Sequence, residues 1–156
     1  WWRSSTFLSI NWCCGINPTT PVNTQEGATP PPTSPPACSS PSVSNVSATT
    51  IQDSGVTYYP ASPTVSYTLC VPAGHEAWVL VRTINNREYA WGPTTSNGRG
   101  SMGVGLGTGA GQQCGESFGL RVVVATAGSI QRNVAYENVP GVVASAGLPT
   151  RPKYCD

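Results

Sequence analysis

The chain has 156 residues, a net charge of +1 and only 10% charged residues, against about 25% in ordinary soluble proteins. This length suffices for one ordinary domain but not for two domains with separate cores. The basic residues are scattered singly, so the sequence offers no basic stripe for nucleic acid and no polybasic patch for anionic lipid. Solubility must then depend on Ser, Thr, Asn and Gln, as is common outside the cell. We therefore expect an extracytoplasmic chain that is secreted, periplasmic or held at the cell surface.

The chain begins with two tryptophans, Trp1 and Trp2, followed by Arg3. Indole rings prefer the membrane–water interface, so this pattern is typical of the outer end of a membrane helix, here one placed upstream of residue 1. The sequence itself contains no run of about 18 apolar residues, the length that spans a bilayer. The other interpretation is that both rings, together with Phe7 and Trp12, pack on the domain or on a neighbouring protein.

Residues 1–41 are predicted to form an extended N-terminal arm. Residues 18–41 are dense in proline, which blocks helix and central strand and favours polyproline II. A short extended stretch is expected at residues 6–10. The composition is typical of a linker or stalk whose Thr and Ser could carry O-linked sugars. Alternatively, the arm is laid along a surface, either its own or that of a partner.

From residue 42 onward the apolar residues follow β-strand patterns, and residues 42–156 are predicted to form a β-sandwich domain. The run 77–84 is almost entirely apolar, so it should be a central strand covered on both faces, with Trp78 as a core aromatic. Asn85-Asn86-Arg87 supplies the turn of a hairpin. Helix is suggested only at residues 129–137, as one short helix or helical turn. Strands or extended segments are expected near residues 43–51, 65–71, 77–84, 88–91, 98–111 and 118–125.

Four motifs of this domain follow one another in a characteristic order: residues 72–82 (PAGHEAWVLVR), the Tyr89–Pro93 patch, Val104–Gly107, and residues 115–125 (GESFGLRVVVA). Their succession resembles Ig-like modules at the extracytoplasmic ends of membrane-anchored bacterial proteins. The resemblance covers residues 42–149. It implies an all-β fold, an Ig-like antiparallel β-sandwich of about seven strands, and a location rather than an activity. The additional cysteines and the N-terminal arm depart from the pattern and favour a specialised partner.

The six cysteines favour disulfides over a zinc site or a redox dithiol, because their number is even, their spacing is wide and no CxxC pair occurs. Spacing alone leaves their pairing open. The neighbours Cys13 and Cys14 are expected to have two different partners rather than each other. A free thiol among the six is the alternative. The candidates are Cys13, Cys14, Cys38, Cys70, Cys114 and Cys155.

No arrangement of residues predicts an enzyme, a metal site or a cofactor. His75 is the only histidine, and it follows a Pro-Ala-Gly turn, so we expect it in solvent without a catalytic or metal-binding role. Residues 99–103 lack the first glycine of a GxSxG nucleophile motif, and no two carboxylates stand out as a catalytic pair. The alternating glycines of residues 103–111 match no phosphate-binding motif. They indicate a strand with one bare face, against which a ring or another backbone can pack.

Several aromatic residues are candidates for an exposed interaction surface. Flat rings could stack on sugars, but packing in the core or at a protein interface is the favoured interpretation. Asn45-Val46-Ser47 is an N-glycosylation sequon with Asn45 as its acceptor. Besides Trp1, Trp2, Phe7 and Trp12 of the arm, the candidate rings are Tyr58, Tyr59, Tyr89 and Trp91.

These observations together predict a non-enzymatic structural or interaction subunit of a membrane-associated or extracellular assembly. It would dock through its N-terminal arm to other protein subunits, of the same or a different chain. One alternative is a carbohydrate-binding module or adhesin. A second alternative is a pilus-like filament subunit, in which residues 6–10 of one subunit complete the sheet of the next by strand donation.

Overall fold

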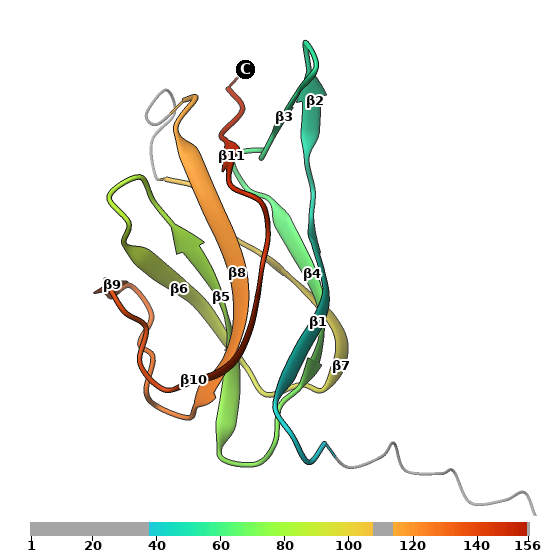
Figure 1. Ribbon diagram of the computed structural model, residues 1–156, viewed down its shortest axis with the longest axis vertical. Coiled ribbons are helices and arrows are strands. Elements are labelled where there is room, and N and C mark those ends of the chain that lie inside the picture. The colour runs from blue at the N-terminus through green and yellow to red at the C-terminus, as the bar shows by residue number, and fades with distance from the viewer. Residues whose placement is uncertain (1–37, 108–113, 156) are drawn as a thin grey trace, which may run out of the picture. The chain divides into compact units, whose positions relative to one another are not determined.

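The computed structural model describes residues 38–107 and 114–155 (Figure 1). The chain divides between Ser34 and Pro35, and every described residue belongs to the second unit. The predicted arm therefore lies almost wholly outside the described residues, as do its extended stretch at residues 6–10 and its four aromatic candidates. The described part of the chain contains no helix long and apolar enough to cross a membrane.

All regular structure in the described residues is β-strand, which confirms the all-β prediction. One sheet has the order β1-β4-β7, and a larger sheet has the order β10-β8-β5-β6-β9, with β11 also paired to β8. β2 and β3 form a separate hairpin, and all the strand pairs are antiparallel. The strands are β1 (Ser42–Ala48), β2 (Ile51–Asp53), β3 (Val56–Tyr58), β4 (Thr64–Cys70), β5 (His75–Arg82), β6 (Glu88–Thr94), β7 (Gly98–Gly103), β8 (Ser117–Thr126), β9 (Ala135–Tyr136), β10 (Val142–Gly147) and β11 (Arg151–Pro152).

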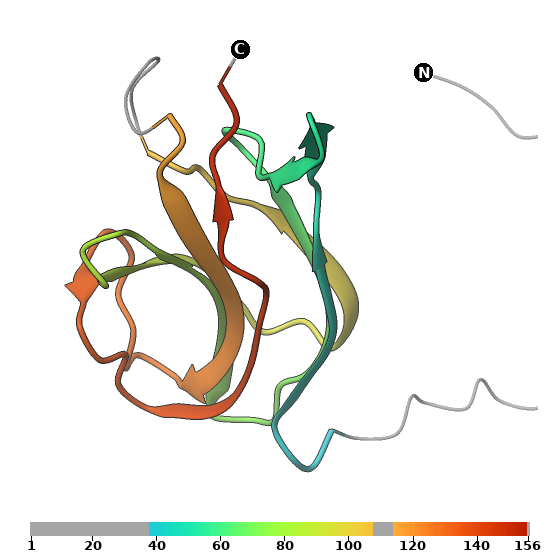
Figure 2. The ribbon, with the colours of Figure 1, turned by 45° about the horizontal axis from the view of Figure 1, so that its top comes forward.

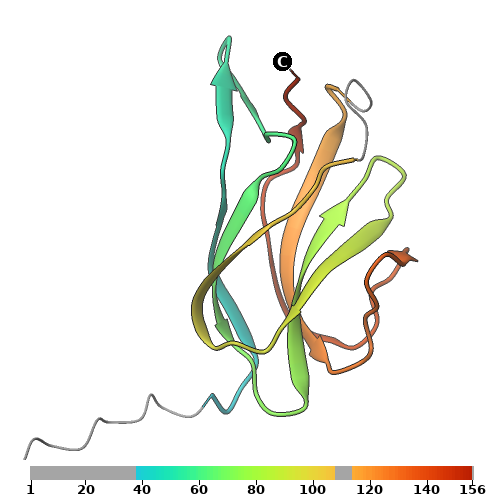
Figure 3. The ribbon, with the colours of Figure 1, turned by 180° about the vertical axis from the view of Figure 1, so that it is seen from behind.

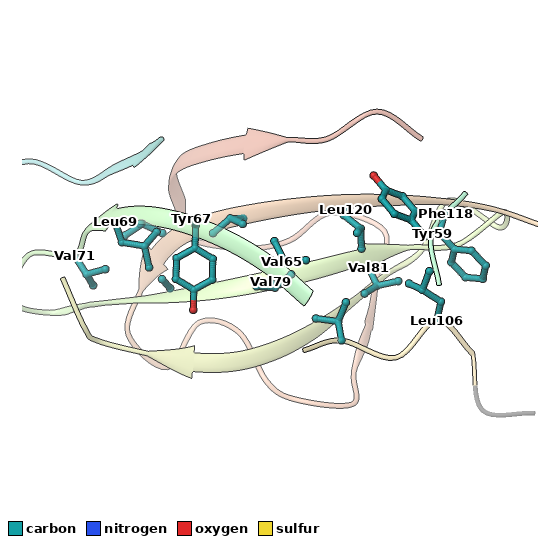
Figure 4. Packing of buried hydrophobic residues seen from close by; sticks show 14 residues of the cluster. Tyr59, Val65, Tyr67, Leu69, Val71, Val79, Val81, Leu106, Phe118 and Leu120 are labelled. Atoms are coloured by element: carbon teal, nitrogen blue, oxygen red, sulfur yellow. The ribbon is translucent and has the colours of Figure 1, made fainter. Parts of the chain in front are cut away.

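The two larger sheets lie face to face and enclose the main core (Figures 2 and 3). The predicted alternation in β4 is confirmed, since Val65, Tyr67 and Leu69 are buried between less buried neighbours. Their side chains meet the inward-facing residues of β5 and β8, among them Val79 and Leu120 (Figure 4). Burial of this continuous apolar interior is the main force that holds the two layers together.

The prediction that the apolar run 77–84 is a central strand covered on both faces is confirmed for residues 77–81, whereas the strand ends at Arg82 and Ile84 is 59% exposed. Alternate residues Ala77, Val79 and Val81 belong to the core between the sheets. Trp78 and Leu80 point to the opposite face, where they form a second buried cluster with residues of β8 and of the segment that follows it. Trp78 is buried as predicted, and the cluster that it joins lies on the face of β5 that is turned away from the main core.

Residues 129–137 form no helix, so the short helix suggested there is wrong. The segment consists of turns and the two-residue strand β9, and its Ile130 is buried in the outer cluster with Trp78. Ser129 explains part of the difference, because its hydroxyl donates a 2.6 Å hydrogen bond to the carbonyl of Thr126. Such local side-chain bonds favour turns over helix.

A β-bulge in β1 explains why its apolar residues are not spaced by two. Ser44 pairs with Thr68 and Ser47 with Ser66, so two residues of β1 oppose one residue of β4. Asn45 occupies the bulge with φ of 50°, a conformation that asparagine tolerates better than most residues. The bulge turns both Val43 and Val46 toward the core, against which they pack.

Gly92 in β6 is expected to be intolerant of a side chain. Its φ is 140°, and a Cβ placed there would lie 3.1 Å from Cε3 of Trp78 and 3.2 Å from the carbonyl of Ala77. Gly92→Ala should therefore lower the free energy of unfolding by about 2 kcal/mol, measured by urea denaturation. Gly103→Ala is the matched control, because its Cβ would meet nothing within 4 Å. Equal stability of the two variants would contradict this account of β6.

Candidate functional site

The predicted aromatic candidates do not form one surface. Tyr58 lies at the end of β3, where its ring is 5.6 Å from that of Tyr154 in an edge-on arrangement. Tyr89 and Trp91 lie two residues apart on β6 and therefore share a face of that strand. Among the described candidates, Tyr89 is the most exposed ring, at 39%.

The prediction that Tyr59 is an exposed ring is wrong. Tyr59 is 1% exposed and belongs to the main core. It follows β3 at the point where the chain meets the C-terminal segment, bridging to Lys153 and donating a 2.7 Å hydrogen bond to the carbonyl of Pro149. The two neighbouring tyrosines therefore differ in their surroundings: the ring of Tyr58 packs near the surface, and the ring of Tyr59 lies in the interior.

Two tyrosines should resist ionisation while the protein is folded. Burial raises the pKa of Tyr59, although the Arg151 guanidinium beside it acts in the opposite direction, and burial likewise raises the pKa of Tyr67. Below pH 10.0, the ordinary pKa of tyrosine, both phenols are protonated in the folded and in the unfolded chain, so they do not make stability depend on pH. Above this pH the unfolded chain releases these protons more readily than the folded chain, so the free energy of unfolding should fall as pH rises. Ultraviolet titration should show two delayed phenols that ionise together with unfolding. Ionisation of every tyrosine before unfolding would contradict this burial.

Trp91 is half-buried and has two close neighbours. The guanidinium carbon of Arg132 lies 5.7 Å from the centre of its ring, a distance typical of a cation–π contact. A Cβ placed on Gly105 would lie 3.4 Å from the indole. A ring therefore packs on the glycine-rich run as expected, but the expected strand is wrong beyond Gly103, because β7 ends there and residues 104–107 are not in a strand. Residues 108–113 of this run lie outside the described residues.

His75 lies in a structural rather than a chemical setting. It is half-buried instead of fully in solvent, and its Nδ1 is 3.2 Å from the carbonyl of Ala73. The neighbouring Glu76 accepts hydrogen bonds from the Trp78 indole at 3.0 Å and from the backbone of Gly128 at 3.1 Å. Glu76 thereby fastens the segment after β8 to β5. Residues 38–107 and 114–155 contain no group of three or more His, Cys, Asp or Glu that could hold a metal ion.

A shallow polar depression of about 520 Å³ lies on the β1-β4-β7 sheet. Asn45 stands at this depression, is exposed, and donates a 3.4 Å hydrogen bond to the Thr68 hydroxyl. The sequon acceptor is thus on the surface, with its amide turned toward β4. The polar side chains that line the depression are Asn45, Ser66, Thr68, Arg99 and Ser101.

The larger sheet carries a cluster of three charged residues, Arg82, Glu88 and Arg121, on its outer face. Arg82 and Glu88 are direct partners in the β5–β6 ladder. Arg121 opposes Leu80 on β5, and its side chain passes diagonally across β5 to reach Glu88 on β6. Three strands therefore position the three side chains, and the sheet register fixes their separation.

Glu88 is the buried member of this charged cluster. Its side chain is 3% exposed, whereas those of Arg82 and Arg121 are 50% and 27% exposed. Glu88 Oε1 accepts from Arg82 Nε at 3.2 Å, Arg82 Nη2 at 3.0 Å and Arg121 Nε at 2.8 Å, and Oε2 accepts from Arg121 Nη2. The contact with Arg121 is bidentate, the geometry in which guanidinium and carboxylate bind most strongly.

A cavity of about 140 Å³ opens beside this charged cluster. Its lining includes both arginines and the surfaces of Gly119 and Gly147, which have no side chain to fill the space. The site was not among the sequence-based candidates. One signal could have revealed it, because Arg121 stands alone within the apolar run of β8, and charges in such strands are usually paired.

The described residues contain two disulfides. Cys38 pairs with Cys70 and Cys114 pairs with Cys155, with Cα–Cα distances of 5.4 and 5.5 Å. Cys70 is the last residue of β4, and the other three cysteines lie outside the strands. Both bridges are favoured by an oxidising compartment. Cys13 lies outside the described residues, as does Cys14.

Comparisons with protein-family models, with curated proteins and with solved structures found no match to this chain. The resemblance of residues 42–149 to bacterial Ig-like modules therefore remains an expectation.

Proposed function

We propose that this chain is a non-enzymatic structural or interaction subunit that acts outside the cytoplasm and docks to other protein subunits through its N-terminal arm. The observation that carries the proposal is the pairing of cysteines. The β-domain joins Cys38 to Cys70 and Cys114 to Cys155, so Cys13 and Cys14 are the two cysteines of the sequence left outside these pairs.

Neighbouring cysteines are poorly placed to bond with each other. Consecutive Cα atoms are about 3.8 Å apart across a trans peptide, whereas disulfide-bonded residues usually have Cα atoms about 4.4–6.8 Å apart. In an oxidising compartment, the two arm cysteines would therefore pair most easily with cysteines of another chain. This favours an arm that is attached to partner subunits over a passive linker.

The surroundings of the acidic residues support a role in binding rather than catalysis. Glu76 is occupied by Trp78 and Gly128, and Glu88 is occupied by two arginines. His75 contacts a backbone carbonyl. Each of these groups has a structural partner, so none is poised as a general acid or base.

The strand order supports an Ig-like sandwich as the architecture of the domain. With the short strands β2, β3, β9 and β11 set aside, β1-β4-β7 faces β10-β8-β5-β6, which parallels the A-B-E and G-F-C strands of immunoglobulin folds. The disulfides differ from the inter-sheet bridge of antibody domains, because Cys70 at the end of β4 pairs with Cys38, ahead of β1. In this proposal, the sandwich is the scaffold and the arm carries the specificity.

Strand donation is a variant of this function that the edge strand β7 favours. Within the described residues, β7 pairs with β4 alone, and most of its residues are exposed. Its other edge thus offers backbone groups to an incoming strand. Residues 6–10 of another copy are the proposed donor, which would make the assembly a filament.

The proposal is tested by replacing both arm cysteines with serine in the full-length chain. Cys13→Ser/Cys14→Ser should remove covalent cross-links to other subunits, as seen by non-reducing electrophoresis of material purified from its source cells. The Cys38–Cys70 and Cys114–Cys155 bridges should be unaffected, which peptide mapping will verify. Wild-type chain that purifies alone, without cross-links and without stoichiometric partners, would sink the proposal.

A further inference from the structure

Within the residues that the structure describes, the cluster of Arg82, Glu88 and Arg121 leaves one positive charge without a counter-charge. Two guanidiniums face a single carboxylate, and Glu88 is the sole acidic residue among those that line the adjoining cavity. Each guanidinium carries five N–H donors. Only two nitrogens of each arginine bond to Glu88, so donors on both side chains remain for a further acceptor.

The sheet is built so that an acceptor can approach these donors. Gly119 is the β8 partner of Arg82, and Gly147 of β10 is the partner of Arg121. A Cβ on Gly119 would lie 3.4 Å from Cβ of Arg82 and 3.6 Å from the Thr150 hydroxyl. A side chain would fit there in ordinary contact, so glycine at this position keeps space open beside the arginines.

The cavity is large enough for a small polar group. Its volume of about 140 Å³ is well above the roughly 10–15 Å³ that one water molecule needs by the same measure. This space accepts one carboxylate with its methylene groups. Leu148 offers an apolar wall for the methylenes, and the Thr150 hydroxyl offers a further donor in the lining.

We infer that this cavity is a docking site for an acidic side chain, aspartate or glutamate, of a protein partner. A carboxylate supplies the single negative charge that the cluster lacks, and its two oxygens match the planar fork of a guanidinium. A phosphate monoester carries closer to two charges, which exceeds the uncompensated charge of the cluster. The inference rests on the proposed function as an interaction subunit, and it adds a second, charge-selective contact on the sandwich.

The test is an NMR titration of the full-length, ¹⁵N-labelled protein with N-acetyl-glutamic acid amide, in which only the side-chain carboxylate is charged. N-acetyl-glutamine amide serves as the uncharged control at the same ionic strength. Saturable shifts are expected with the glutamate probe at the Nε–H groups of Arg82 and Arg121 and at the amides of Gly119 and Gly147. The glutamine probe should produce no saturable shift.

Variants locate the effect within the cluster. Arg82→Gln should weaken binding at least about tenfold, because a charge-assisted hydrogen bond is lost. Gly119→Ala should weaken it severalfold by filling the cavity while every charge is kept. Arg87→Gln is the matched control, since Arg87 is paired with Glu137 away from the cavity lining, and its loss should change affinity by less than about twofold. If Arg82→Gln is poorly folded, Arg82→Lys provides the same test, because it keeps the charge but not the planar fork.

Several outcomes would overturn the inference. Equal binding of the two probes would exclude recognition of the carboxylate, and unchanged affinity in Arg82→Gln and Gly119→Ala would place binding elsewhere. Tighter binding of inorganic phosphate than of the glutamate probe would assign the cavity to a different anion. These results do not depend on the arm. A chain that forms arm-linked complexes but does not bind the glutamate probe would refute this docking site while the proposed function stands.

Discussion

Arg121→Gln is expected to lower the free energy of unfolding by about 3 kcal/mol, because it removes the bidentate partner of a buried carboxylate. Glu88 is 3% exposed and receives two hydrogen bonds from Arg121. The variant would leave Glu88 with Arg82, which is half-exposed and therefore partly screened by water. Thermal and urea denaturation of purified variant and wild type would measure the difference.

Arg82→Gln is the internal comparison for this prediction. Its side chain is 50% exposed and bonds to one oxygen of Glu88, so its loss should cost only about 1 kcal/mol. We therefore expect Arg121→Gln to lower the free energy of unfolding by clearly more than Arg82→Gln does. Equal effects, or a larger effect at Arg82, would mean that solvent exposure does not govern the strength of these ion pairs. Because Arg82→Gln is expected to cost little stability, this variant should remain folded in the binding experiment.

Loss of the Cys38–Cys70 disulfide is expected to destabilise the domain by about 4 kcal/mol. The bridge closes a loop with a sequence separation of 32 residues, and the chain-entropy model gives an effect of this size for such a loop. The comparison is the double variant Cys38→Ser/Cys70→Ser against wild type under non-reducing conditions. Unfolding should shift to markedly lower denaturant concentration.

The second disulfide provides the control. Cys114–Cys155 closes a loop with a separation of 41 residues, so its removal should cost a similar amount. Reduction of the wild type with dithiothreitol should reproduce the combined loss. If the reduced protein is as stable as the oxidised protein, the disulfides have no structural role, and the argument for an oxidising compartment weakens.

Sequence patterns predicted the main strands because burial imposes a clear period on them. β4 is covered on one face, so its apolar residues alternate with polar ones, whereas β5 is covered on both faces, so its apolar run is continuous. β10 escaped prediction because its sequence, VVASAG, is half Ala and Gly, which have weak strand propensity. β9 and β11 have two residues each, too few to show any period. These strands are specified by tertiary contacts.

The charged cluster could be predicted only in part. The sequence shows an isolated Arg121 in an apolar run, but not that it would reach Glu88 across an intervening strand, because that depends on sheet register.

Tyr59 was expected among the exposed rings but is buried. Its neighbour Tyr58 is half-buried near the surface, and only the return of the C-terminal segment, with its bridge at Lys153, encloses Tyr59.

The most direct test of the proposed subunit role is mass spectrometry of the full-length chain as isolated from its source, without reduction. Native spectra give the assembly, and peptide mapping of the same material gives every disulfide. We expect Cys38–Cys70 and Cys114–Cys155 within the chain, with Cys13 or Cys14 joined to a cysteine of another subunit. A monomer in which Cys13 and Cys14 are both reduced thiols would contradict it.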